Sequence, residues 1–374
     1  MGAPKTSKPV LFVTGHAPSD RVGAFAALHE REGIEYALFG GRVQHGFAPV
    51  GEESRELPFP HRQVPQRRIA QLAASGRYRA VVCSTGGRAA LPAAWAGARR
   101  ARLPVILWTS LWAHPRSAAH LLSFLALRRL YRSADAVVTY GPHVSAYVRA
   151  RGAHNVHVAP QSVDNAFWHS TDCTPATLPE PAAQAEVKFL FAGRPTREKG
   201  LGVLIEAWSD SGLTAPSAAL VLVGVGSAPP WVPAGGAVRG ALVCLDPVSA
   251  RQMRALYAAA DVLVVPSIAT RTFREPWGLV VNEAMNRQLP VIASDAVGAA
   301  AGGLVRDGRN GLIVPAGNTG ELAGAMRRLA ADASLRAKLG TVGREDVLAY
   351  TPDAWADGFS SALASIGLSR EGRW

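Results

Sequence analysis

The chain has no long apolar run and few cysteines. It has 374 residues, 48% of them hydrophobic, yet no apolar run approaches the roughly 20 residues that a membrane helix needs. Its N-terminal stretch lacks the charged, apolar and cleavage regions of a secretion signal. The three cysteines are odd in number and far apart, which argues against a disulfide framework or a zinc site. We therefore expect a protein of the reducing cytoplasm.

Several catalytic motifs are also missing. The sequence has neither a Gly-x-Ser-x-Gly nucleophile elbow nor a phosphate-binding Walker A run. Gly224 and Gly226 form a Gly-x-Gly after an apolar run, but the third glycine and the acidic partner of a dinucleotide site are absent. His154 and His157 lack a carboxylate or cysteine that would complete a metal site. These absences argue against an esterase, a P-loop enzyme, a dinucleotide enzyme and a zinc enzyme.

The charge is unevenly distributed. The net charge is +12, and residues 1–185 carry +10 of it. A basic half indicates an acidic partner, such as anionic lipid, a phosphorylated substrate or nucleic acid. A genome that favours arginine is the alternative, since only five of the 40 basic residues are lysine. Both interpretations remain open. The arginines are not interleaved with stacking aromatics, so we expect no nucleic-acid partner.

Short apolar runs alternate with amphipathic stretches along the whole chain. This alternation predicts an α/β protein with two Rossmann-like, doubly wound domains, each a parallel sheet covered by helices on both faces. Two such domains would face each other across a cleft at the carboxyl ends of their strands, where ligands bind. We expect an N-terminal domain at 1–165, a linker at 166–186, a C-terminal domain at 187–350 and a final segment at 351–374.

Residues 190–208, LFAGRPTREKGLGVLIEAW, contain the first candidate site. A predicted strand ends at Gly193, and a helix is expected to begin near Gly200. The loop between them carries Arg194, Arg197 and Lys199. Cations beside the amide groups of a helix N-terminus favour an anion such as a diphosphate. A solvated basic loop is the alternative.

Residues 270–285, TRTFREPWGLVVNEAM, contain two glutamates eight positions apart. Pro276 suits the first turn of a helix, so we expect a helix over 277–286 with Glu275 just before it and Glu283 inside it. At about 1.5 Å per residue the two carboxylates are too far apart to act as a pair. They are suited to hold the two ends of an extended ligand, with the amides of Gly278, Leu279 and Val280 facing its middle. A surface helix with an acidic first turn is the alternative.

The combination of these stretches resembles the retaining GT-B glycosyltransferases of family GT4. Their signature is a strand, then Gly-Arg-(x)4-Lys-Gly, then a Pro-Ser and a Glu-x7-Glu. It occurs here as AGRPTREKG, VVPS and EPWGLVVNEAM. The resemblance covers the C-terminal half almost completely, whereas the N-terminal half matches in layout more than in residues. It implies that the domain at 1–165 binds the acceptor and that the domain at 187–350 binds the nucleotide sugar. It also implies a C-terminal helix within 351–374 that packs back on the N-terminal domain.

The resemblance implies a role for each matching residue. Arg194 and Lys199, beside Gly193, would hold the donor's diphosphate. Glu275 would bond hydroxyls of the transferred sugar, and Glu283 those of the ribose. Gly23 matches the second glycine of a family Gly-Gly whose first position is Val22 here.

One catalytic position departs from the family pattern. Many members have a histidine at the end of a strand before the acceptor cleft, and Trp108 occupies the matching place. His114, six residues later, is the candidate substitute, and a plain loop histidine is the alternative. His16 is a weaker candidate for the same role.

The resemblance implies a retaining, metal-independent enzyme. The sequence has no Asp-x-Asp, the metal-nucleotide motif of the other large glycosyltransferase fold, so we expect neither a cofactor nor a metal site. The partners would be a nucleotide-sugar donor and an acceptor that is an envelope lipid, a glycan or a small natural product. We expect a cytoplasmic protein with peripheral contact to the inner, acidic membrane face. A nucleotide-sugar epimerase of the same fold and a non-enzymatic sugar- or nucleic-acid-binding protein are the alternatives.

Overall fold

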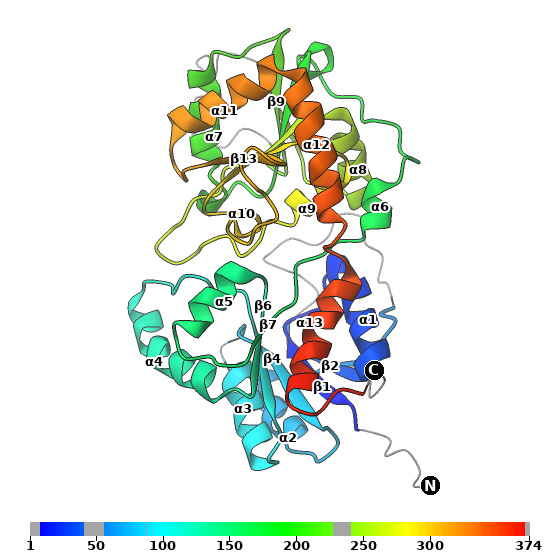
Figure 1. Ribbon diagram of the computed structural model, residues 1–374, viewed down its shortest axis with the longest axis vertical. Helices are drawn as coiled ribbons and strands as arrows, with labels where there is room; N and C mark the ends of the chain where they lie inside the picture. Colours follow the sequence, from blue (N-terminus) through cyan, green and yellow to red (C-terminus); the bar gives the residue numbers. More distant parts are fainter. Residues whose placement is uncertain (1–7, 41–55, 88, 227–240, 371–374) are drawn as a thin grey trace. The chain divides into compact units, whose positions relative to one another are not determined.

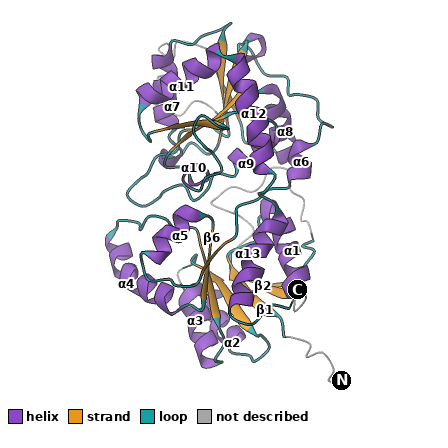
Figure 2. Cartoon of the chain, in the orientation of Figure 1, coloured by secondary structure: helices purple, strands orange, loops and turns teal. Residues whose placement is uncertain are grey.

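The computed structural model describes residues 8–40, 56–87, 89–226 and 241–370 (Figure 1). The chain divides into two compact units: Met1–Asp164 with Tyr350–Trp374, here unit 1, and Asn165–Ala349, here unit 2. Figure 2 shows that in each unit the strands lie between helices. Because each sheet is covered on both faces, its strands are almost continuously apolar, as the sequence pattern predicts.

Unit 1 has a seven-stranded parallel sheet in the order β3-β2-β1-β4-β5-β6-β7. Its strands are β1 (Val10–Thr14), β2 (Ile34–Leu38), β3 (His61–Gln63), β4 (Ala80–Ser84), β5 (Val105–Thr109), β6 (Ala136–Thr139) and β7 (Val156–Val158). Its helices are η1 (Ser19–Arg21), α1 (Val22–Glu32), η2 (Gln66–Arg68), α2 (Ile69–Ala73), α3 (Ala90–Arg100), α4 (Ala118–Ser133), α5 (Pro142–Arg149) and α13 (Pro352–Ser365), where η marks a short 3-10 helix.

Helix α13 lies beside α1 on one face of this sheet (Figure 1). It begins where Thr351 accepts a hydrogen bond from the amide of Ala354, with Pro352 in the first turn. Trp355 and Phe359 are fully buried against Phe12, whose ring centroid lies 5.3 Å from that of Phe359. These two buried side chains make α13 part of the core of unit 1. Truncating a buried aromatic side chain lowers the free energy of unfolding by about 3–5 kcal/mol, so the helix contributes to the stability of the unit.

The other face of the first sheet is covered by helices from the middle of the N-terminal segment. Buried residues of α2, α3, α4 and α5 pack there against β1, β4 and β5. The connections that follow the strands leave the sheet at its carboxyl edge, which is the edge that carries ligand sites in open α/β sheets.

Unit 2 has a six-stranded parallel sheet in the order β10-β9-β8-β11-β12-β13. Its strands are β8 (Val187–Ala192), β9 (Ala218–Val223), β10 (Ala241–Leu245), β11 (Val262–Val265), β12 (Val291–Ser294) and β13 (Gly311–Val314). Its helices are α6 (Asn165–His169), η3 (Ala182–Gln184), η4 (Arg197–Lys199), α7 (Leu201–Ser211), α8 (Ala250–Ala259), α9 (Val280–Asn286), α10 (Gly298–Ala301), α11 (Thr319–Ala331) and α12 (Ala333–Val347).

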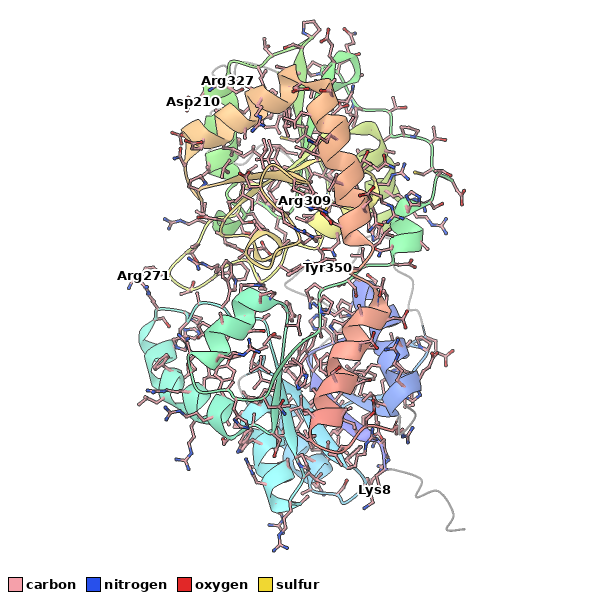
Figure 3. The ribbon with its side chains drawn as sticks, in the orientation of Figure 1. Lys8, Asp210, Arg271, Arg309, Arg327 and Tyr350 are labelled. Atoms are coloured by element: carbon pink, nitrogen blue, oxygen red, sulfur yellow. The ribbon has the colours of Figure 1, made fainter. Side chains whose placement is uncertain are left out.

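Helices α7 and α11 pack together over one face of the second sheet and bury Trp208 and Met326. Figure 3 labels Arg327 of α11 and Asp210 of α7, and Arg327 Nη1 donates to the Asp210 carbonyl at 3.2 Å. Helix α12 packs on α9. Arg309, also labelled in Figure 3, forms an ion pair with Asp346 of α12.

The predicted fold class is confirmed, because both units contain the expected parallel sheets. Two edge strands, β3 and β7, were not predicted, since neither carries a buried apolar run. In the segment expected as a linker, 166–186, the structure has most of α6 and all of η3, and α6 packs on α9 within unit 2. Helix α13 lies within the segment expected to hold the C-terminal helix, and it packs on α1, β6 and β7.

Candidate active site

The strand order of unit 2 creates a switch point between β8 and β11. From β8 the chain continues through α7 to β9 on one side, and from β11 it continues through α9 to β12 on the other. The connections that follow β8 and β11 therefore diverge and leave a crevice at the carboxyl edge, where α/β sheets bind ligands. These two connections contain the basic loop and the first glutamate that the sequence pattern singles out.

The basic loop follows β8 and enters α7 through η4. The amide of Gly193 donates to the Val223 carbonyl, so the loop leaves the sheet beside β9. Gly200 has φ +70°, and a Cβ there would lie 1.9 Å from the Pro266 carbonyl oxygen. Only glycine fits this close approach, which brings the loop against the connection that follows β11.

Lys199 and Glu275 meet at this crossing. Lys199 Nζ lies 2.6 Å from Glu275 Oε2, and the Glu275 side chain is only 9% exposed. The hydroxyl of Ser267, which is fully buried just after β11, donates to the same carboxylate oxygen at 3.3 Å. Arg194, two residues after β8 ends at Ala192, is half-buried in the same loop. The structure therefore brings together two of the predicted site residues as an ion pair.

The helix expected at 277–286 begins later than predicted, at Val280. Gly278 has φ +95°, which is incompatible with a right-handed helix, so Pro276 and Trp277 lie before the helix rather than in its first turn. Within the described residues, no protein group accepts a hydrogen bond from the amides of Gly278, Leu279 or Val280. The three predicted amide donors therefore lie in the turn that enters α9.

Glu283 lies on α9 and is held by a tyrosine of α8. The Tyr257 hydroxyl donates to Glu283 Oε2 at 2.7 Å, and Tyr257 is fully buried. Burial, followed by the neighbouring carboxylate, raises the pKa of Tyr257 well above its ordinary value. The tyrosine thus stays protonated and remains a donor to Glu283 at any pH near neutrality.

A cavity of about 290 Å³ lies beside the basic loop. It is lined by Pro195, Thr196, Arg197, Gly200, Leu201, Gly202, Val203 and Ile268. The lining includes Arg197 and the first turn of α7 but neither Lys199 nor Glu275. The cavity therefore lies beside the basic loop that carries Lys199, but the ion pair of Lys199 and Glu275 does not line it.

The remaining predicted residues belong to unit 1. Gly23 is exposed in the first turn of α1. His114 lies in the connection between β5 and α4, with Nε2 2.6 Å from the His120 carbonyl oxygen and its ring against Phe124. Trp108 is 6% exposed at the end of β5. Its indole nitrogen can only donate, so Trp108 cannot act as a proton acceptor.

Sequence reasoning assigned no role to two residues that position the glutamates. Ser267 belongs to the Pro-Ser of the family signature, and its place directly after an apolar strand was the available signal. No sequence pattern marked Tyr257, because its contact with Glu283 joins residues of two different helices that are 26 positions apart. Within the described ranges, no three His, Cys, Asp or Glu side chains are grouped so as to hold a metal ion. Likewise, no helix in the described part is long and apolar enough to span a membrane.

Comparison with known proteins gives matches in sequence and in fold. Residues 186–332 match the model of the family described as glycosyl transferases group 1. A D-inositol 3-phosphate glycosyltransferase of Streptomyces bingchenggensis is 37% identical over 109 residues, 27% of this chain and 22% of that protein. The enzyme of the same name from Pseudarthrobacter chlorophenolicus is 31% identical over 195 residues, 50% of this chain and 44% of that protein. The chain thus spans less than half the length of these relatives.

The fold comparison covers nearly the whole chain. The crystal structure of Anabaena HepE in complex with UDP and glucose matches with a TM-score of 0.70 and 18% identity, over 96% of this chain and 100% of that one. At this identity the match shows a shared fold, and that fold is the GT-B arrangement of two parallel-sheet domains.

Proposed function

We propose that this chain, whose residues 186–332 match the glycosyl transferases group 1 model, moves a sugar from a nucleoside-diphosphate sugar to an acceptor. The observation that carries the proposal is the contact of Lys199 with Glu275 at the switch point of unit 2. A cation suited to a phosphate and a carboxylate suited to sugar hydroxyls lie side by side there. A nucleotide sugar needs both groups at the bond that breaks.

Each residue has a proposed role in this reaction. Arg194 and Lys199 hold the diphosphate and stabilise the charge that grows on it as the sugar leaves. Glu275 accepts hydrogen bonds from hydroxyls of the transferred sugar, and Ser267 helps to orient it. Glu283, positioned by Tyr257, accepts hydrogen bonds from the ribose hydroxyls. The amides of Gly278, Leu279 and Val280 face the diphosphate between the two glutamates.

The proposed chemistry retains the configuration at the anomeric carbon. An acceptor oxygen attacks that carbon from the face on which the diphosphate leaves. The bond between the anomeric carbon and the phosphate oxygen breaks, and its electron pair stays with the diphosphate. A phosphate oxygen takes the acceptor's proton, so the products are the glycoside and the nucleoside diphosphate. Because the two cations and the helix amides neutralise the diphosphate, the step needs no divalent metal.

The comparisons indicate which ligands to try first. HepE was solved with UDP and glucose and also with UDP-glucose, so UDP and UDP-glucose are the first ligands to test, followed by the GDP and TDP compounds. Two relatives are named for D-inositol 3-phosphate, so phosphorylated polyols join envelope lipids, glycans and natural products as acceptors. A cytoplasmic location with peripheral contact to the inner membrane face is part of the proposal.

The experiment is a thermal-shift screen of nucleotides and nucleotide sugars, followed by turnover assays with and without EDTA. Ligand stabilisation grows as the logarithm of concentration over dissociation constant, so the screen ranks donors. We expect one nucleotide class to stabilise the chain and slow hydrolysis of its sugar conjugate to persist in EDTA. Isomerisation of the donor alone would instead show an epimerase. Stabilisation by random DNA with no response to any nucleotide would show a non-enzymatic binding protein.

A further inference from the structure

Arg21 occupies an unusual place in unit 1. It is the last residue of η1, in the connection between β1 and α1. Its guanidinium carbon lies 5.0 Å from the ring centroid of Trp108 and 5.3 Å from that of Tyr140. Trp108 is the next-to-last residue of β5 and Tyr140 follows β6, so the guanidinium lies at the carboxyl edge of the seven-stranded sheet. Its side chain is only 15% exposed.

The protein meets only part of this cation's hydrogen-bonding capacity. Arg21 Nη2 donates to the Tyr140 hydroxyl at 3.2 Å and to Gln161 Oε1, both of which are neutral. Among the described residues, the closest carboxylate oxygen is Asp20 Oδ2, which lies 3.9 Å from Nε and is beyond hydrogen-bond distance. In the part of the chain that the structure describes, neither Nη1 nor Nε donates a hydrogen bond to a protein acceptor.

A second donor without an acceptor lies beneath Arg21. The indole Nε1 of Trp108 is buried and has no hydrogen-bond partner among the described residues. A purely structural cross-link between loops would not need a nearly buried cation, because a neutral donor could serve the same two acceptors at a smaller desolvation cost. Arginine adds a permanent charge and a planar fork of donors, which match the geometry of phosphate and carboxylate groups.

We propose that Arg21 binds an anionic group, phosphate or carboxylate, carried by the acceptor. This inference rests on the proposed function, since it assigns the acceptor's charge to a place in unit 1. The Trp108 and Tyr140 rings fix the plane of the guanidinium, and Gln161 and the Tyr140 hydroxyl fix its rotation. Nη1 and Nε remain to donate to the anion. Arg21 is thus a specificity-determining residue that selects charged acceptors over neutral ones.

The experiment monitors the arginine Nε–H resonances of the full chain by NMR during titration with inorganic phosphate. The Arg21 resonance is assigned as the one missing from Arg21→Lys. We expect it to shift saturably with phosphate and to shift less at high salt, because the interaction is electrostatic. Glucose 6-phosphate and glucuronate separate a phosphate source from a carboxylate source, and glucose is the neutral control. If the Arg21 resonance responds to neither anion, the proposal is wrong.

Variants test the same point independently. Arg21→Gln is expected to weaken phosphate binding by about tenfold or more, because charge-assisted hydrogen bonds are lost. Arg21→Lys keeps the charge without the fork and is expected to fall between Arg21→Gln and the parent, which keeps the test valid if Arg21→Gln folds poorly. Arg31→Gln is the matched control: Arg31 lies at the other end of α1 and is already paired with Asp353 and Asp357. Equal phosphate binding by all three variants would overturn the proposal.

The two proposals fail in different ways. Nucleotide binding belongs to unit 2, so UDP is expected to bind Arg21→Gln as it binds the parent. If the parent binds phosphate at Arg21 but binds no nucleotide, the glycosyltransferase proposal fails while the anion site stands. If the parent binds nucleotide but Arg21 does not respond to anions, the anion site fails alone.

Discussion

Lys199 Nζ lies 2.6 Å from Glu275 Oε2, although the two residues are 76 positions apart in the chain. Each is also proposed to contact a different part of the donor, so the ion pair couples the group that holds the diphosphate to the group that holds the sugar. A substitution at either residue therefore also removes a contact of the other residue.

This contact predicts that substitutions of the two residues have non-additive effects on the free energy of unfolding. Lys199→Met and Glu275→Gln, each of which breaks the pair, are expected to destabilise unit 2, and the double variant to be less unstable than the sum of the two. Residues in direct contact commonly show coupling of about 0.5–3 kcal/mol. Urea unfolding of the four proteins measures it. Arg309 and Asp346 form a more exposed control pair, for which we expect a smaller coupling. Additive effects at Lys199 and Glu275 would contradict the prediction.

Substitutions of the two glutamates are expected to affect different steps: Glu283→Ala the binding of UDP, and Glu275→Ala the chemical step. Glu283→Ala is expected to weaken UDP binding, because contacts to ribose are alike in the ground and transition states and so appear in KM. Glu275→Ala is expected to bind UDP like the parent but to lower kcat, since its bonds position the sugar. Calorimetry with UDP distinguishes them. Tight UDP binding by Glu283→Ala and weak binding by Glu275→Ala would reverse the assignment.

Arg194→Ala is expected to act on the chemical step. The charge on the diphosphate grows as the sugar leaves, so a cation that contacts it stabilises the transition state more than the bound donor. Loss of a charge-assisted hydrogen bond worth roughly 1.5–3 kcal/mol lowers kcat by about tenfold to a hundredfold. Steady-state kinetics with the best donor measure this. Arg251→Ala, on an exposed position of α8, is the control. A change in KM alone would assign Arg194 to uniform binding instead.

His157 is expected to make unit 1 less stable in acid. Burial, followed by the charge of Arg149, lowers the pKa of His157 below its ordinary 6.5. Between the two pKa values the folded state then binds fewer protons than the unfolded state. The stability that neutral His157 contributes is therefore fully present above pH 6.5 and is lost as the pH falls below 6.5 towards the folded pKa. One such proton changes the free energy of unfolding by at most about 1.4 kcal/mol per pH unit.

The measurement is urea unfolding of the parent and His157→Asn between pH 7.5 and pH 5. We expect a shallower pH dependence in the variant. His154→Asn, at an exposed position three residues earlier, is the control and is expected to keep the parent's slope. An unchanged slope in His157→Asn would show that other groups cause the acid sensitivity.

Glu32→Gln is expected to be strongly destabilising. Glu32 is fully buried, and its Oε2 accepts hydrogen bonds from Arg79 Nη2 and from the Arg370 amide, each at 3.0 Å. Removing one partner of a buried ion pair costs about 3–5 kcal/mol, because the other charge is left uncompensated. Urea unfolding measures the loss. Glu30→Gln, on the exposed side of α1, is expected to change stability by less than about 0.5 kcal/mol.

The sequence predicted those elements whose residues form a pattern within one short segment, and it missed those that depend on contacts between distant segments. The central strands, such as β1 and β11, were predicted because burial on both faces makes them continuous apolar runs. Strand β3 was missed because it is a short, largely exposed edge strand. The start of α9 was misplaced because the positive φ of Gly278 belongs to a turn packed against Val297, a contact that no local pattern reveals.

The candidate site shows the same limit. Lys199 and Glu275 were each singled out from motifs, but their ion pair was not, because it depends on β8 and β11 being neighbours in the sheet. The Arg21 site was not anticipated at all. Its members come from strand β5 and three separate connections in the first 161 residues, and only the fold brings them together.

The return of α13 to unit 1 has a consequence for synthesis of the chain on the ribosome. Residues 165–349 form a continuous segment, so unit 2 has all its parts as soon as that segment has emerged. Unit 1 begins to emerge first but lacks Trp355 and Phe359 until the last helix is made. Its apolar surface around Phe12 and Phe25 is therefore exposed for most of translation, and the unit synthesised first is the last to be completed. A nascent chain stalled before residue 350 is expected to bind a hydrophobic-surface chaperone through unit 1 and to release it once α13 is added.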